Sequence, residues 1–325
     1  MNLTFLRLAR FGTVLALLVV MLGAWVRLSN AGLGCPDWPG CYGRMIVPDH
    51  ATAAQELGAD YAQRPLEAGK AWREMIHRYL AGTLGLVCVA LAALAWVNRG
   101  NPRQPWRRPL GLVGLIVFQA LLGMWTVTLL LKPLIVVAHL FGGLATLAVL
   151  SSLARRRTVK FPSPTPALRA LALGAAAALV LQIFLGGWTS SNYAALACPD
   201  FPTCQTRYWP PITDFKDGFV LWRGLGQNYE GGVLDHPARV AIHFTHRLGA
   251  ILAAVLIALL GARLAFEPAT RRDGLAVLVA LVCQLTLGVS IVVFGVPLYV
   301  AVAHNGVAAL LLLTVVNANQ RISNT

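Results

Sequence analysis

The chain carries one succession of landmarks twice, in the same order. SNAGLGCPDWPGC (29–41) recurs as SNYAALACPDFPTC (191–204), EMIHRYLAGTLG (74–85) as HFTHRLGAILAA (243–254), and VAHLFGGLATLAVL (137–150) as VAHNGVAALLLLTV (302–315). A repeat of this length sets the architecture before any single residue is considered. The chain is therefore predicted to be a tandem duplication, in which each half contains one pair of cysteines and two equivalent histidines.

Composition places both halves in a membrane. Apolar residues make up 57% of the chain, charged residues make up only 12%, and the mean hydropathy is +0.64. A helix needs about 20 apolar residues to cross about 30 Å of hydrocarbon. Stretches of that kind lie at about 11–28, 77–97, 109–131, 134–153, 168–188, 241–264, 274–294 and 297–318. We therefore expect an all-α integral membrane protein with eight transmembrane helices.

The first apolar stretch has some features of a signal peptide, because Arg7 and Arg10 precede it. It continues into Trp25 and Arg27 without a small-residue cleavage site, so we interpret it as a retained span. Four spans then fall in each half, at 1–157 and 158–325. Because four is even, the halves are predicted to be parallel four-helix bundles, related by a pseudo-two-fold axis along the membrane normal.

The formal charge of +14 suggests nucleic-acid binding, but its distribution indicates membrane topology instead. With the N-terminus inside, 15 of the 27 basic residues lie in inner segments: Arg7, Arg10, Arg99, Arg103, Arg107, Arg108, Arg155, Arg156, Arg157, Lys160, Arg169, Arg263, Arg271, Arg272 and Arg321. Only Glu267 and Asp273 accompany them, whereas the outer segments are nearly neutral. Since basic residues accumulate on the cytoplasmic side, we predict a bacterial cytoplasmic (inner) membrane protein with both termini inside and no nucleic-acid partner.

Both cysteine pairs then lie in long periplasmic loops, at about 29–73 and 189–240, where disulfides are permitted. Close spacing and recurrence favour pairing within each loop, Cys35 with Cys41 and Cys198 with Cys204. Each disulfide is interpreted as a structural clamp or, alternatively, as a reducible redox pair. Two further cysteines, Cys88 and Cys283, lie inside apolar stretches and are interpreted as core residues.

Four histidines fall at equivalent points of the two halves. His77 and His246 lie at outer starts of predicted spans, whereas His139 and His304 lie about 9–10 Å below the outer starts of later ones. A lone histidine there can be an interhelical hydrogen bonder, but a repeated pair of costly ionisable groups predicts a functional site. Two imidazoles on different helices of a bundle match the axial ligands of a heme iron, whereas zinc would need further ligands.

The halves differ three residues before the first histidine, a spacing that keeps both residues on one helix face. Glu74 precedes His77, whereas His243 precedes His246. This difference suggests that one half has kept a cofactor while the other does chemistry, although Glu74 can also be a first-turn acid favoured by the helix dipole. Arg78 and Arg247 follow the histidines. We predict that they bind heme propionates, with snorkelling of the side chains as the alternative.

Together these motifs make the chain resemble the heme A synthases, membrane enzymes that convert heme O to heme A for cytochrome oxidases. The resemblance implies heme b as a cofactor on His246 and His304 in the C-terminal half. It implies that heme O, the substrate, and heme A, the product, bind near His77 and His139 in the N-terminal half. Glu74 is then catalytic, together with these two histidines, in oxidising the C8 methyl group of heme O to a formyl group.

Two other function classes use the same features. A diheme membrane electron carrier or quinol/thiol oxidoreductase would share the histidines and cysteines but would release no modified heme. A transporter should have broken midplane helices and a deep polar pathway, whereas the polar residues here cluster near the outer surface. The expected partners are a heme O synthase, an unidentified electron donor and membrane lipid. Homo-oligomerisation is left open.

Overall fold

The computed structural model describes residues 3–155 and 164–323. Eight long helices within these ranges are long and apolar enough to cross a membrane, which confirms the predicted all-helical class and the eight spans. They are α1 (Leu3–Leu28), α4 (Ala68–Val97), α5 (Arg107–Thr128), α6 (Pro133–Leu153), α7 (Pro166–Ser191), α9 (His236–Phe266), α10 (Arg271–Val293) and α11 (Leu298–Ser323). Several begin where the sequence supplies a start signal. Pro133 and Pro166 occupy the first turns of α6 and α7, where a missing N–H costs little.

The chain divides into two compact units. Unit 1 consists of Met1–Ala154 and Leu221–Val233, and unit 2 of Arg155–Val220 and Leu234–Thr325. The predicted boundary at 157 falls outside the described residues. Assignment of 221–233 to unit 1 was not expected, because that segment belongs to the loop at about 189–240, in the second half of the sequence.

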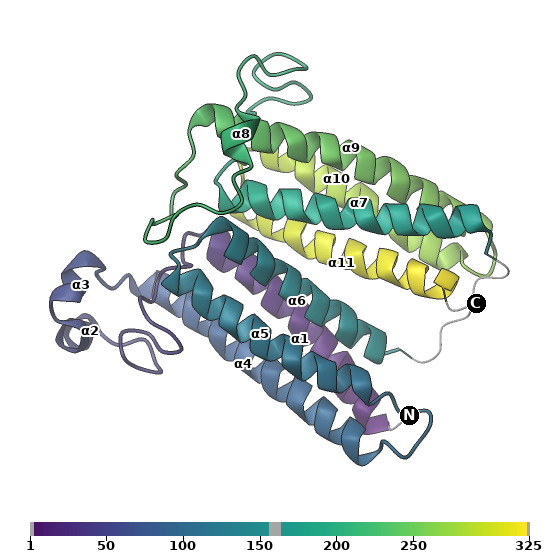
Figure 1. Ribbon diagram of the computed structural model, residues 1–325, viewed down its shortest axis with the longest axis horizontal. Helices are drawn as coiled ribbons and strands as arrows, with labels where there is room; N and C mark the ends of the chain where they lie inside the picture. The colour runs from purple at the N-terminus through teal and green to yellow at the C-terminus, as the bar shows by residue number, and fades with distance from the viewer. Residues whose placement is uncertain (1–2, 156–163, 324–325) are drawn as a thin grey trace. The chain divides into compact units, whose positions relative to one another are not determined.

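In unit 1 the four long helices pack in a closed ring, in which α1 contacts α4 and α6, and α5 contacts α4 and α6 (Figure 1). Two short helices, α2 (His50–Leu57) and α3 (Ala59–Gln63), lie in the loop before α4 and project beyond the ends of the long helices (Figure 1). Asp49 caps α2 by accepting a hydrogen bond from the backbone N–H of Thr52. That capping residue is the sequence signal by which α2 could have been predicted.

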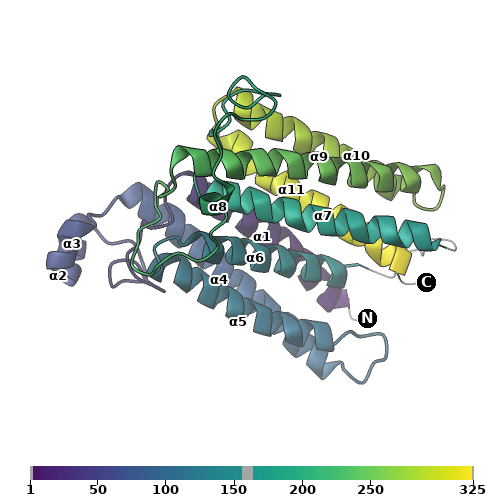
Figure 2. The same ribbon diagram turned by 45° about the horizontal axis from the view of Figure 1, so that its top comes forward.

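In unit 2 the four long helices pack in the same order, with α9 contacting α7 and α10, and α11 contacting α7 and α10 (Figure 2). One short helix, α8 (Phe215–Gly218), packs against α9. The indole N–H of the buried Trp188 donates to the carbonyl of Gly218 at 2.9 Å, which fixes α8 to the end of α7.

Two helices are longer than predicted. The sequence places the spans at about 77–97 and 241–264, whereas α4 begins at Ala68 and α9 at His236. Hydropathy detects only the part of a helix that faces lipid, so the polar outer turns were missed. His77 therefore lies nine residues, or about 14 Å, into its helix rather than at its start.

The hairpin between α9 and α10 depends on Gly274, because any side chain at this position would collide with the backbone of α9. A Cβ on Gly274 would lie 2.3 Å from the backbone nitrogen of Ala265 and 2.5 Å from the carbonyl oxygen of Gly261. We expect Gly274→Ala to lower the free energy of unfolding by about 1–3 kcal/mol through overpacking, measured by denaturation in detergent. Gly174→Ala in α7 is the control, because no atom lies within 4 Å of its Cβ position. Equal stability of the two variants would contradict this close approach.

Candidate functional site

Glu74 lies in α4 with its side chain buried and both carboxylate oxygens occupied. Its Oε2 accepts a hydrogen bond from the backbone N–H of Cys35 at 2.9 Å, and its Oε1 accepts from Nη2 of Arg78 at 2.5 Å. Arg78 follows Glu74 by four residues, so the helix itself brings the two side chains together. The carboxylate therefore connects α4 to the first residue of the cysteine loop.

Arg78 completes this connection. Its Nη1 donates to the carbonyl oxygens of Asp37 at 3.0 Å, Pro39 at 3.2 Å and Gly40. The sulfur atoms of Cys35 and Cys41 lie 2.01 Å apart, so the loop that these carbonyls belong to is closed as predicted. The guanidinium predicted to bind a heme propionate is thus engaged by the loop in this structure, and the propionate contact stays a prediction.

Unit 2 repeats the arrangement with one change of chemistry. The backbone N–H of Cys198 donates to Nδ1 of the buried His243 at 3.2 Å, and Arg247 donates to the carbonyls of Thr203 at 2.7 Å and Cys198 at 2.8 Å. Cys198 and Cys204 lie at disulfide distance, with sulfur atoms 1.94 Å apart. His243, to which the sequence assigned no role, is therefore the positional counterpart of Glu74 as acceptor for the loop.

An aspartate shapes each loop. Asp37 accepts hydrogen bonds from the backbone N–H groups of Tyr42 at 2.6 Å and Gly43 at 3.0 Å, a local closure typical of aspartate in turns. Asp200 accepts equivalent bonds from Gln205 at 2.7 Å and Thr206 at 2.9 Å. The pKa of Asp200 is lowered, mainly by the hydroxyl hydrogen bond of Thr203. The repeated C-P-D motif therefore has a structural reason that sequence reasoning did not identify.

In unit 1 the two predicted histidines are brought together. The ring centroids of His77 on α4 and His139 on α6 are 6.5 Å apart, with the ring planes at 72°. Glycines leave room for both rings. A Cβ on Gly23 would lie 3.0 Å from Nε2 of His77, and one on Gly123 would lie 3.3 Å from Cε1 of His139. Gln119 donates to the backbone carbonyl of His139 at 2.7 Å, which fixes α5 against α6.

In unit 2 the predicted pair lies on α9 and α11, and each ring again faces a glycine. Cβ positions on Gly186 and Gly288 lie 3.2 Å from His246 and 3.1 Å from His304, respectively. Glutamines contact both rings. Nε2 of Gln182 is 3.0 Å from Nδ1 of His246, and Nε2 of Gln284 is 3.1 Å from Nε2 of His304. Gln182 was missed by the sequence reasoning because the repeat has no matching glutamine in α1.

The donor set fits a heme better than a bare metal ion. Nδ1 of His139 and Nδ1 of His304 are buried without a hydrogen-bond partner, which is unusual for a buried polar atom and typical of a ligand site. Across residues 3–155 and 164–323, no cluster of three or more His, Cys, Asp and Glu side chains could hold a metal ion. A heme iron needs only two axial ligands from the protein.

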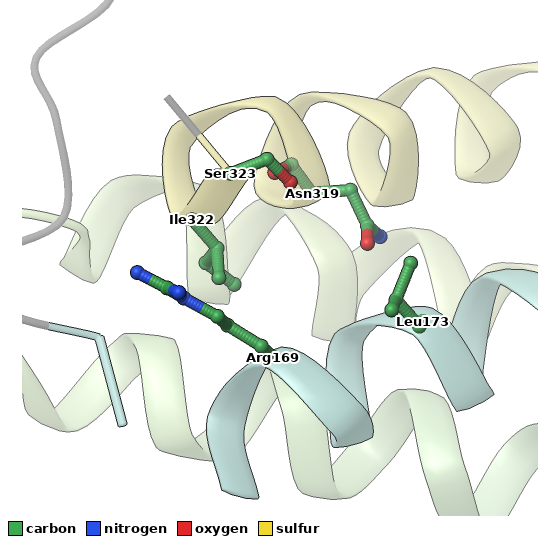
Figure 3. A pocket seen from close by; sticks show the side chains of 5 residues that line it. All are labelled: Arg169, Leu173, Asn319, Ile322 and Ser323. Atoms are coloured by element: carbon green, nitrogen blue, oxygen red, sulfur yellow. The ribbon is translucent and has the colours of Figure 1, made fainter. Parts of the chain in front are cut away.

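A pocket between α7 and α11 lies away from these histidines. Figure 3 shows Arg169 and Leu173 on α7 facing Asn319, Ile322 and Ser323 on α11. Asn319 is 15 residues beyond His304 on the same helix, or about 22 Å along its axis. This pocket is therefore not part of the histidine site.

Comparison with known proteins covers nearly the whole chain. Residues 7–316 match the COX15–CtaA family, described as cytochrome oxidase assembly protein. A heme A synthase of Shewanella oneidensis is 46% identical over 96% of this chain and 94% of its own length. Heme A synthases of Methylobacterium radiotolerans (31% identity, 95% of this chain and 88% of that protein) and Halalkalibacterium halodurans (28%, 94% and 93%) are also similar.

The cysteine contacts generate a prediction about the purified protein. Mass mapping of the unreduced chain should find Cys35 joined to Cys41 and Cys198 joined to Cys204, because each pair closes one loop held by an arginine of the following helix. Cys88, which is buried, should alkylate only after unfolding. Cross-pairing between the loops, or four reduced thiols, would contradict this assignment.

Proposed function

The chain belongs to the COX15–CtaA family of cytochrome oxidase assembly proteins, and we propose how its two halves divide the work of a heme A synthase. The observation that carries the function is the 46% identity to the Shewanella heme A synthase, which extends over 96% of this chain. Heme A synthase converts heme O to heme A, and the change is oxidation of the C8 methyl group to a formyl group. The electron-carrier and transporter alternatives lose their support, because similarity to these enzymes runs through both halves.

We propose that the halves are two tandem four-helix bundles related by a pseudo-two-fold axis along the membrane normal. The N-terminal half (1–157) receives heme O, and the C-terminal half (158–325) holds heme b. Supporting this division, both units have the same order of helix contacts and the same clamp on the cysteine loop. Only the acceptor differs, an acid in the first half and an imidazole in the second.

His246 and His304 are the residues proposed to hold the iron of heme b. Each ring lies against a glycine, and Nδ1 of His304 has no protein partner, so the rings have room and ligand capacity. When bound, heme b supplies a redox-active iron that can relay electrons. Gln182 and Gln284 contact these imidazoles, and their proposed task is to orient the rings.

His77 and His139 are proposed to hold heme O, the substrate. Their ring centroids lie 6.5 Å apart on two different helices, so the two imidazoles together would hold the iron of the heme. Holding the iron at a defined position also orients the C8 methyl group of the substrate, and orientation alone lowers the barrier substantially. The exclusion of water by the apolar helices limits side reactions of a reactive oxidant.

Glu74 is the proposed catalytic carboxylate of this half. Arg78 and the backbone N–H of Cys35 each donate a hydrogen bond to it, so the carboxyl group is held in one orientation. Each carboxylate oxygen retains a second lone pair, which leaves capacity to accept a proton from the substrate or to stabilise positive charge that develops there. Glu74 is thus proposed to act on the substrate as well as to hold its loop, whereas the role of His243 is only to accept the hydrogen bond from the loop of the heme b half.

The proposed orientation places both termini in the cytoplasm and both cysteine loops at the periplasmic surface of a bacterial inner membrane. The distribution of basic residues supports it. The proposed partners are a heme O synthase that delivers the substrate, an unidentified electron donor, and lipid around the spans. Arg78 and Arg247, at the outer level of the bundle, are proposed to meet heme propionates when heme is bound.

The heme b assignment is tested by His246→Ala and His304→Ala. Each change removes one axial ligand, so the purified full chain should lose its low-spin bis-histidine absorbance and retain less than about a tenth of its heme b. His236→Ala is the control, because His236 is exposed and contacts only Gln205 in the loop. An unchanged spectrum in both ligand variants would refute the assignment.

The role of Glu74 is tested by Glu74→Gln, which keeps the size of the side chain but removes its charge and basicity. We expect normal membrane insertion and a normal heme b spectrum, with heme A formation lowered about 100-fold, as for loss of an acid–base group. Extracted hemes should show accumulation of heme O or an intermediate. Glu67→Gln is the control, because Glu67 occupies the N-cap position of the same helix without a side-chain capping bond, and its exposed carboxylate pairs with the nearby Lys70. Heme A production at the wild-type rate would limit Glu74 to its structural contacts.

A further inference from the structure

The strongest observation outside the heme sites is a buried lysine at the turn between α5 and α6. Lys132 is 1% exposed, although lysine is almost never fully buried unless paired. Its Nζ donates to the carbonyl oxygens of Arg223 at 2.5 Å and Gly224 at 3.3 Å, and lies 3.5 Å from the ring centroid of Trp222. All three partners belong to the segment 221–233. The ammonium group of Lys132 therefore contacts three consecutive residues that lie about 90 positions away in the sequence.

A second contact holds the same segment to the same turn. The backbone N–H of Tyr229 donates to the carbonyl of Leu130 at 3.0 Å, and the side chain of Tyr229 is buried at 2% exposure. Its hydroxyl donates to the carbonyl of Gly224 at 3.3 Å, which closes the segment on itself. The segment is therefore held to the turn before α6 at two points, through residues 222–224 and through Tyr229.

The second half has no equivalent of this cation. Leu130 and Leu131 have φ of 52° and 61°, and the matching turn before α11 has Gly295 at 68° and Val296 at 59°. The next residue is Lys132 in the first turn but a proline in the second. The turns are therefore alike in backbone and different in charge, and the lysine is special to the half that contains Glu74.

We infer that the segment 221–233 is a strap that Lys132 fastens over the outer turn of unit 1, and that Lys132 is thereby a positioning residue for His139. The helix α6 begins directly after Lys132, and His139 follows seven residues later on the same rigid element. Because the contacts of Lys132 hold the turn to the segment 221–233, they limit the movement of α6 and therefore of the His139 side chain. The strap belongs by sequence to the heme b half, so the substrate half is completed by chain from its counterpart. The effect on His139 rests on the proposed function, in which His139 holds heme O.

The fastening is tested by limited trypsin digestion of the purified full chain, because the strap contains its own cleavage site after Arg223. Lys132→Met keeps most of the side-chain volume but removes the charge and the donors. We expect cleavage after Arg223, measured by mass spectrometry relative to cleavage after Lys216 in the same loop, to accelerate about tenfold. Lys70→Met should leave the ratio unchanged, since Lys70 pairs only with Glu67. Lys132→Arg, which keeps the charge and donors, should restore protection in part.

The positioning role is tested by heme A formation as a function of heme O concentration. In Lys132→Met we expect the half-saturating heme O concentration to rise about fivefold, with a maximal rate within twofold of wild type and an unchanged heme b spectrum. An unchanged cleavage ratio would overturn the strap, whatever the activity. Faster cleavage with wild-type heme O dependence, or a loss confined to the maximal rate, would overturn the positioning role.

A third variant keeps the test of the strap decisive if Lys132→Met does not fold. Trp222→Leu removes the ring over the ammonium group at a side chain that is 55% exposed, so the fold should survive. Cleavage after Arg223 should then rise about two- to threefold, because the lysine hydrogen bonds remain. No rise would contradict the strap. Proteolysis needs no enzymatic activity, so this result is independent of whether the proposed heme O site is correct.

Discussion

The hydrogen bond from the first cysteine N–H of each loop to a buried acceptor on the following helix is the contact on which the loop end of each unit depends. In one unit the acceptor is Glu74, and in the other it is His243. An arginine four residues later binds the carbonyls of the same loop. Because an unpaired buried carboxylate would be very costly, the position of Glu74 and the closure of its loop are mutually dependent.

This dependence accounts for the length of α4, which begins at Ala68. A helix that began at about 77, where hydropathy places the span, would leave Glu74 outside it. In α9 the counterpart His243 already lies within the stretch that hydropathy predicts. Glu74 and His243 each precede their histidine by three residues and lie on the same helix face as that histidine. In unit 1 the contact with the cysteine loop, Glu74 and His77 thus lie along one helix, so a displacement of the loop would move the carboxylate of Glu74.

The asymmetry between the halves is a matter of few residues. The loops, the glycines beside the imidazoles and the ring of helices recur, whereas Glu74 and Lys132 occur only in the first half. A duplicated scaffold can thus keep the same helix packing while a few side chains give its two halves different chemistry. The contacts of Lys132 add that unit 1 includes a segment, 221–233, that belongs by sequence to the second half.

The sequence by itself determined the eight spans, the repeat, the histidine pairs and the cysteine pairing. Hydropathy and a duplicated motif are patterns of neighbouring residues, so they can be recognised without a three-dimensional structure. The sequence placed the starts of α4 and α9 too late, since their polar outer turns have no hydropathy signal. Only the tertiary structure decided that Glu74 and His243 share the role of loop acceptor and that Lys132 holds the segment 221–233. Those contacts join residues 39, 45 and 91 positions apart, and no local pattern encodes which distant carbonyl or N–H a buried charge will meet.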